Sequence, residues 1–245
     1  MRGIRLLIEY DGSDFVGWQV QRRGRTVQGE LANALCILLR EDITPIGSGR
    51  TDAGTHALGQ VAHFHTRSSA ATERMLRGLN GLLPRDICIH AVDEVNLEFH
   101  ARYSAKRKRY RYRIHLGKSA MQRRYTWSLH TPLNIERMQD ASDHLKGTHN
   151  FSAFCKQDPV PDLFSCAIFA ADWRSEGREL IFEIEGNRFL RHMVRILVGT
   201  IVEIGSNKRS PEDVVRLLQD GRREDAGKTA PASGLHLLKV YYDNT

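Results

Sequence analysis

The chain has 245 residues, of which 41% are hydrophobic, and this is enough for one large domain or two small ones with a packed core. No apolar run approaches the roughly 18 residues of a membrane-spanning helix, and the N-terminus is apolar too briefly for a signal peptide. The four cysteines stand too far apart for a zinc motif or a disulfide framework, so we expect reduced thiols in a cytoplasmic protein. The net charge of +7 favours a polyanionic partner such as nucleic acid.

The first part of the sequence predicts strands and helices in alternation. Apolar residues alternate over residues 4–10 as in a strand, which turns at Asp11-Gly12. Thr26 is expected to cap a helix with an apolar stripe from Val27 to Leu38. A strand over residues 58–66, a second helix that stops before Pro84 and a strand over residues 87–91 complete a compact α+β pattern.

A glycine-punctuated loop over residues 47–57 lies between the first helix and the second strand. It brings together one carboxylate, Asp52, one guanidinium, Arg50, and one imidazole, His56. Glycine allows tight turns and close approach to a ligand. A lone acid beside a lone arginine in such a loop indicates a positioned reactive group.

A basic segment follows, with no acidic residue between Glu98 and Glu136. Its centre alternates as a strand, which places Arg107, Arg109, Arg111 and Arg113 on one face and Tyr110 and Tyr112 on the other. We expect the arginine face to contact a nucleic-acid backbone, and the tyrosine face to line a core or a base pocket.

The rest of the chain repeats this pattern loosely. Asn134 is expected to cap a helix, and two strands are predicted over residues 167–173 and 179–185. A long helix over residues 189–204 would place Arg188, Arg191 and Arg195 on one face near its N-terminus, where the helix dipole disfavours cations. Asp52 or a phosphate would compensate. A helix beginning near Ser210 and a strand over residues 235–242 complete the sequence.

We therefore expect two α+β halves with a cleft between them. Residues 1–105 form the half with the carboxylate loop, and residues 106–245 form the half with the basic strand and the arginine helix.

Two other functions fit parts of the sequence. Asp52, His56, His63 and His65 could hold a metal in a nuclease or phosphoesterase, although no second carboxylate and no H-E-x-x-H motif accompany them. A non-catalytic RNA-binding protein would use the basic strand but would not need Asp52.

Several stretches together resemble the tRNA pseudouridine synthase A (TruA) family. They are residues 10–19, 26–31, 49–54, 108–112, 147–151, 189–195 and 233–235, in the family's order and over nearly the whole chain. The catalytic positions show no departure; Thr55 stands where some members have valine, away from the chemistry.

The resemblance implies the α+β pseudouridine synthase fold, in which two similar halves share a mixed, mainly antiparallel sheet with a basic active-site cleft between them. It also implies the isomerisation of uridine to pseudouridine at positions 38, 39 and 40 of the tRNA anticodon stem-loop. It implies no cofactor and no metal, and a homodimer in which one tRNA spans both subunits. The glycosidic bond would move from nitrogen 1 to carbon 5 of a uracil that is flipped out of its stack.

The same resemblance assigns roles to individual residues. Asp52 would be the nucleophile, attacking the sugar or the uracil ring or promoting an elimination at the sugar, and the sequence leaves these routes open. Tyr110 would accept or relay the carbon 5 proton, and Arg195 would pair with Asp52. Arg50 would help to displace the base and Leu235 would pack against it, with the remaining substrate contacts from Arg107, Arg109, Arg111 and Arg191.

Overall fold

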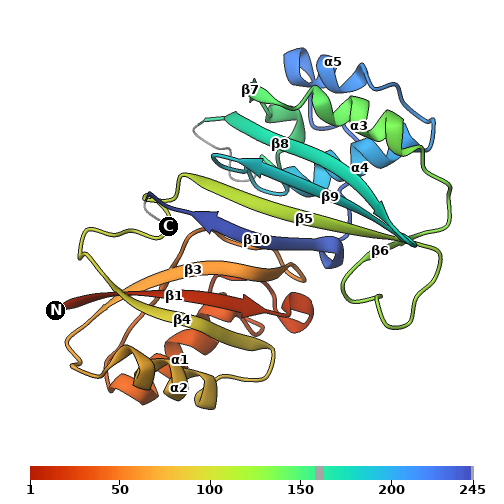
Figure 1. Cartoon of the computed structure of the whole chain (residues 1–245). Coiled ribbons are helices and arrows are strands. Elements are labelled where there is room, and N and C mark those ends of the chain that lie inside the picture. Colours follow the sequence, from red (N-terminus) through yellow and green to blue (C-terminus); the bar gives the residue numbers. More distant parts are fainter. Residues whose placement is uncertain (158–162, 244–245) are drawn as a thin grey trace. The chain divides into compact units, whose positions relative to one another are not determined.

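The computed structural model describes residues 1–157 and 163–243 (Figure 1). The chain divides into two compact units. The first contains Met1–Lys106 together with the C-terminal residues from His236 onward, and the second contains Arg107–Leu235. Each unit contains strands and helices of its own.

The first unit is a mixed sheet in the strand order β4-β1-β3-β10. Its strands are β1 (Arg2–Tyr10), β2 (Ile46–Gly47), β3 (His56–Thr66), β4 (Ile87–Val95) and β10 (Leu235–Tyr241). β1 pairs antiparallel with β3 and β4, β2 pairs antiparallel with β3, and β10 runs parallel to β3.

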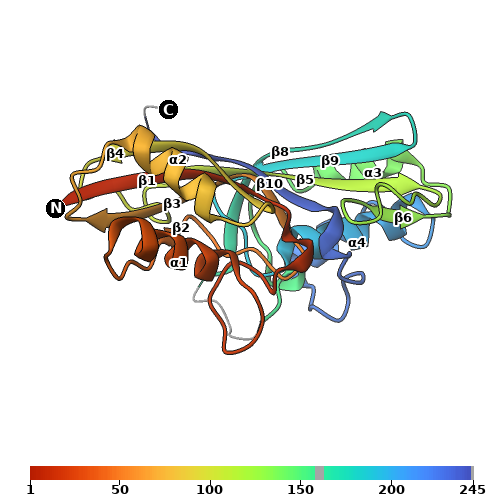
Figure 2. The ribbon, with the colours of Figure 1, turned by 90° about the horizontal axis from the view of Figure 1, so that it is seen from below.

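Two helices cover one face of this sheet: α1 (Val27–Leu39) and α2 (Thr72–Leu82) (Figure 2). Ile4, Leu6 and Ile8 alternate along β1 and are fully buried on the face that the helices cover. The side chain of Thr26 accepts a hydrogen bond from the Gly29 amide, as a helix cap does, so the predicted cap is confirmed.

The second unit has the strand order β5-β9-β8-β7. Its strands are β5 (Arg107–Leu116), β6 (Trp127–Leu129), β7 (Gly147–Asn150), β8 (Ser165–Glu176) and β9 (Glu179–Gly186), and its helices are α3 (Ile135–Asp143), α4 (Met193–Gly205) and α5 (Asp213–Asp220). Only the β5–β6 pair is parallel among the pairings described in this sheet. Figure 2 shows α3 and α4 on one side of it.

The face of this sheet away from α3 and α4 carries a ladder of ion pairs. Arg107 binds Glu185, Arg109 and Arg111 both bind Glu183, and Arg113 binds Glu179. Arg174 on β8 also donates to Glu183 at 3.0 Å. The predicted arginine face therefore exists, but β9 supplies glutamates to it. Tyr110 and Tyr112 lie on the buried face, as predicted.

The predicted helix over residues 189–204 begins too early. α4 starts at Met193, and His192 before it has the left-handed backbone angle φ 62°, which an α-helix does not allow. Arg188 and Arg191 thus lie in the preceding turn, and the expected stripe of three arginines on one helix face is wrong. α5 likewise begins at Asp213, whose carboxylate accepts the Ser210 amide.

The α+β fold class, with mixed and mainly antiparallel pairing, is confirmed. Within the described residues, no helix has the length and apolarity needed to cross a membrane. All four cysteines are free; Cys155 and Cys166 are buried, whereas Cys36 is exposed. Burial raises the pKa of the Cys166 thiol to about 11, which makes it unreactive.

The ladder predicts a specific loss of stability for Glu183→Gln. Glu183 is 7% exposed, and its carboxylate binds three arginines. The substitution should therefore lower the free energy of unfolding by about 2 kcal/mol. The matched variant Glu176→Gln, at a carboxylate 58% exposed and bound to Arg174 alone, should cost less than about 0.5 kcal/mol.

The pH dependence of this loss has a definite sign. Burial alone would raise the pKa of Glu183, but hydrogen bonds from Arg111 and Arg174 outweigh it and hold the pKa below its ordinary value of 4.5. A carboxyl group whose pKa is lowered in the folded protein stabilises the fold at pH values above its ordinary pKa. This stabilisation is lost as the pH falls. Urea unfolding should show the full difference in free energy of unfolding between wild type and Glu183→Gln at neutral pH. This difference should disappear below pH 4.5. Equal losses for both variants would contradict the ladder.

Candidate active site

Asp52 lies in the loop between β2 and β3, in the first unit. The residue is half-buried, whereas Arg50 is exposed and its guanidinium has no hydrogen bond or ion pair within the described residues. A half-buried carboxylate beside an exposed cation can be held in place and still reach a substrate.

The loop is tied down where it begins. Ser48 donates its hydroxyl to the Gln60 side chain at 2.7 Å, and the Gln60 amide donates to the Gly49 carbonyl at 3.0 Å. Ser48 and Gln60 are both fully buried. Hydrogen bonds in such a dry place exchange little with water, so this end of the loop is rigid.

A second segment, residues 10–18, clamps the part of the loop that carries Asp52. The Tyr10 and Thr51 hydroxyls lie 2.7 Å apart, and the Trp18 amide donates to the Thr51 carbonyl at 3.1 Å. The Gly54 amide donates to the Phe15 carbonyl at 3.2 Å, and the loop closes on itself through Thr55 N–H and Asp52 C=O at 3.1 Å. The backbone on both sides of Asp52 is therefore fixed from outside the loop.

Tyr10 belongs to this support of the loop. Burial raises the pKa of Tyr10 to about 12, although hydrogen bonds with Thr51 and Gln60 oppose the rise. Its phenol is neutral near pH 7, which suits a hydrogen bond to a hydroxyl.

In the second unit, Tyr112 and Arg195 bind the segment over residues 230–235, and Tyr110 lies two residues before Tyr112 on β5. Tyr110 is 8% exposed, and its ring meets Phe189 edge-on at 5.1 Å. Tyr112, two residues along the same face, donates its hydroxyl to the Pro231 carbonyl at 2.7 Å. Burial raises the pKa of Tyr112 well above its ordinary value, and the nearby charge of Arg195 partly opposes that rise.

Arg195 is fixed by reciprocal hydrogen bonds with Ala230. Its Nε donates to the Ala230 carbonyl at 2.8 Å, and the Ala230 amide donates to the Arg195 carbonyl at 3.0 Å. Leu235, at the end of the same segment, is 6% exposed. The second unit thus holds the segment that ends at Leu235 through Tyr112 and Arg195.

The predicted substrate contacts on β5 are engaged with glutamates. Arg107, Arg109 and Arg111 bind Glu185 or Glu183, but a guanidinium carries five N–H donors, so these pairs do not exhaust it. Arg191 is exposed in the turn before α4, where its carbonyl accepts the Lys156 amide at 3.0 Å.

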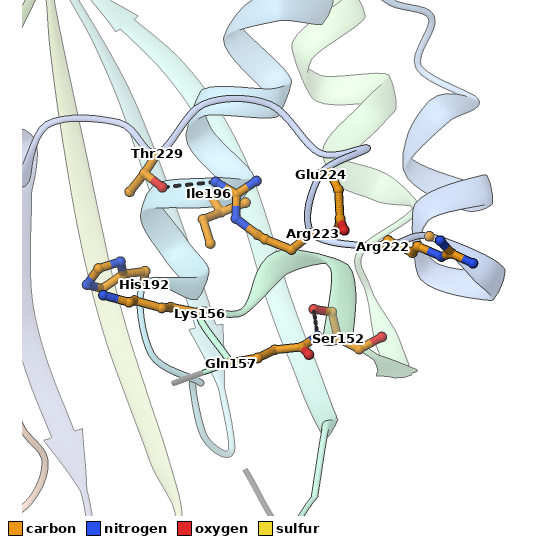
Figure 3. Close-up of a pocket in the computed structure, with 10 residues that line it drawn as sticks. Ser152, Lys156, Gln157, His192, Ile196, Arg222, Arg223, Glu224 and Thr229 are labelled. Carbon is orange, nitrogen blue, oxygen red and sulfur yellow. Dashed lines mark hydrogen bonds between the residues drawn. The ribbon is translucent and has the colours of Figure 1, made fainter. Parts of the chain in front are cut away.

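A hollow of about 670 Å³ lies in the second unit near the start of α4 (Figure 3). Its cations are Lys156, Arg222 and Arg223, and its acid is Glu224. Arg223 turns inward to the Thr229 hydroxyl at 3.0 Å, whereas Arg222 points away from the other side chains.

The four residues that a metal-dependent hydrolase could use do not come together as a metal site. In residues 1–157 and 163–243, no three His, Cys, Asp or Glu side chains are placed to hold one ion. His56 and His63 instead use their Nδ1 atoms to accept the amides of Gly12 and Ala101, at 3.1 and 3.2 Å. Two of the four proposed ligands are thereby committed to backbone.

Comparison with known proteins agrees with the resemblance seen in the sequence. A family model described as tRNA pseudouridine synthase matches residues 6–104 and 141–243. The chain is 44% identical over its whole length to the whole of tRNA pseudouridine synthase A of Anoxybacillus flavithermus. It is 48% identical to the same-named protein of Halalkalibacterium halodurans, over 96% of this chain and 90% of that one.

The chain belongs to the tRNA pseudouridine synthase family. This confirms the family predicted from the motifs. Among solved structures, the archaeal box H/ACA sRNP Nop10–Cbf5 complex overlaps 89% of the chain with 12% identity and a TM-score of 0.37, a likeness too low to support an argument.

Sequence reasoning found the family's motifs but missed how they support one another. The role of Tyr10 and Gly12 in holding the Asp52 loop has no local signal, because their partners lie about 40 residues away. The glutamates opposite the arginines did have a signal. Glu179, Glu183 and Glu185 share one strand face, which could have been matched with residues 107–113.

The clamp predicts that Gly12→Ala is strongly destabilising. A Cβ on Gly12 would lie 1.9 Å from the Thr55 carbonyl oxygen, so backbone must shift, and we expect a loss of about 3 kcal/mol in the free energy of unfolding. The matched variant Gly81→Ala, where a Cβ meets nothing within 4 Å, should be neutral or stabilising by about 0.5 kcal/mol. Urea unfolding measures both, and a Gly12→Ala protein as stable as wild type would refute the close packing.

Proposed function

We propose that this protein isomerises uridine to pseudouridine at positions 38, 39 and 40 of the tRNA anticodon stem-loop, with Asp52 as the nucleophile. The observation that carries the proposal is a half-buried carboxylate on a loop clamped at both ends, in a chain of the tRNA pseudouridine synthase family. Clamping suits a group that must meet one atom of a flipped nucleotide, because positional error costs rate.

The bond changes assign work to three side chains. Asp52 attacks the sugar or the uracil ring, or promotes elimination at the sugar, so that the bond to nitrogen 1 breaks. The uracil then turns and bonds through carbon 5 while any bond to Asp52 breaks. Nitrogen 1 takes up a proton, and Tyr110 accepts or relays the proton that carbon 5 loses. Arg195, whose side chain is oriented by Ala230, is the proposed partner of Asp52.

Substrate handling falls to the exposed cations. The target base must leave a stacked stem at a cost of a few kcal/mol, and the unengaged guanidinium of Arg50 is suited to fill the space. Leu235 supplies an apolar contact for the uracil. Arg107, Arg109, Arg111 and Arg191 are proposed contacts with the RNA backbone.

The assembly is part of the same proposal. We expect a homodimer in which one tRNA spans both subunits, with functional halves at residues 1–105 and 106–245 and with no metal or organic cofactor. Light scattering on the purified protein, with and without tRNA, measures the oligomeric state. A monomer at all concentrations would remove the dimer from the proposal.

Asp52→Asn should abolish product, with turnover at least about 1,000-fold lower, because the amide is a poor nucleophile. Unmodified tRNA is incubated with the protein in EDTA and pseudouridine is mapped chemically, while filter binding measures tRNA affinity, which should stay within about three-fold. Asp42→Asn, at an exposed carboxylate of the same unit, is the control and should keep full activity.

Each contrary result favours a stated alternative. Loss of wild-type activity in EDTA would favour the metal-dependent hydrolase. RNA binding without product from either wild type or Asp52→Asn would favour a non-catalytic RNA-binding protein. Normal product from Asp52→Asn would leave the family activity but remove Asp52 as its nucleophile.

Tyr110→Phe should fold and bind tRNA yet turn over at least about 100-fold more slowly, since the carbon 5 proton loses its acceptor. Tyr103→Phe is the control, because that ring is 75% exposed. Single-turnover kinetics under saturating enzyme separates the chemical step from binding. A near-normal rate for Tyr110→Phe would take this phenol out of the mechanism.

A further inference from the structure

His56 lies four residues after Asp52 and has no part in the chemistry above. Its side chain is buried, with the residue 3% exposed, at the first position of β3. Its ring stacks on His236 of β10, with centroids 4.7 Å apart and planes 19° apart. A polar ring sealed in this way needs a reason, because burying polar atoms is costly unless they form hydrogen bonds.

The reason is the Gly12 amide, which donates to His56 Nδ1 at 3.1 Å. A backbone N–H has a fixed direction, so Nδ1 must act as the acceptor and the ring proton lies on Nε2. Asp11 Oδ1 accepts the Ser13 amide at 2.9 Å and lies 3.2 Å from the same nitrogen. The Gly12 amide therefore meets the ring at Nδ1, which acts as an acceptor.

This hydrogen bond holds Gly12, which lies where residues 10–18 contact the Asp52 loop. Gly12 is packed so tightly against Thr55 that a Cβ would overlap the Thr55 carbonyl oxygen. The Thr55 amide in turn holds the Asp52 carbonyl at 3.1 Å. A shift of the turn at Gly12 is thus passed through Thr55 to the backbone of Asp52.

We propose that His56 is a positioning residue for Asp52, and that it acts through an unprotonated Nδ1 which fixes Gly12 while His236 supports the ring from the other side. The inference rests on the proposed function of Asp52. The role proposed for His56 involves neither metal binding nor proton transfer.

The test separates the hydrogen bond from the packing. His56→Phe keeps a flat ring for stacking on His236 but has no acceptor. His56→Asn loses the ring but places Oδ1 two bonds from Cβ, as Nδ1 is in histidine. His56→Gln carries its acceptor one bond further out, and His65→Phe is the control on the exposed part of the same strand.

Single-turnover rates, tRNA dissociation constants and thermal unfolding are measured for all four variants. We expect His56→Phe and His56→Gln to lose about 10- to 100-fold in rate with tRNA affinity within about two-fold, since only the position of Asp52 changes. His56→Asn should recover most of the rate even where it is the least thermally stable of the three.

The order of the rates decides the proposal. Rates that follow thermal stability, with His56→Phe above His56→Asn, would show a purely structural ring and overturn it. Unchanged rates in His56→Phe would do the same. Failure of the proposed function is seen separately, because the wild-type protein and His65→Phe would then form no pseudouridine.

Discussion

The contact between residues 10–18 and the Asp52 loop is the constraint on which the site depends. Loops at functional sites are usually the mobile part of a fold. Here the loop backbone finds its partners in a neighbouring turn instead of water, through the carbonyls of Thr51 and Phe15 and the amides of Gly54 and Trp18. Each bond is modest alone, but together they leave the Asp52 side chain as the part of the loop that can adjust.

The second unit uses the same device with different residues. Side chains hold the segment over residues 230–235: Tyr112 binds Pro231 and Arg195 binds Ala230. A Cβ on Gly234 would lie 2.6 Å from the Tyr112 ring, so that ring and backbone are in full contact. The residues with proposed catalytic roles are therefore oriented by neighbours that have none.

The sequence predictions are right where a structure depends on residues that are close in the sequence. Periodicity and capping located α1 and α3, since Thr26 and Asn134 accept amides three residues ahead. The start of α4 was misplaced because residues 189–192 have helical spacing while His192 adopts a left-handed conformation. The clamp escaped prediction for another reason: its strength lies in pairs about 40 residues apart, which leave no periodic trace.

The arginine ladder shows why charge must be read in pairs. A segment of 37 residues without an acid suggested an open cationic face, yet its arginines meet glutamates delivered by β9. Opposite charges across neighbouring strands favour one register, because a one-residue slip would move every arginine to the buried face. The ladder thus helps to align β5 with β9, and that alignment places Tyr110 on the covered side beside Phe189. The charge that suggested RNA binding also orients the tyrosine that the proposed reaction requires.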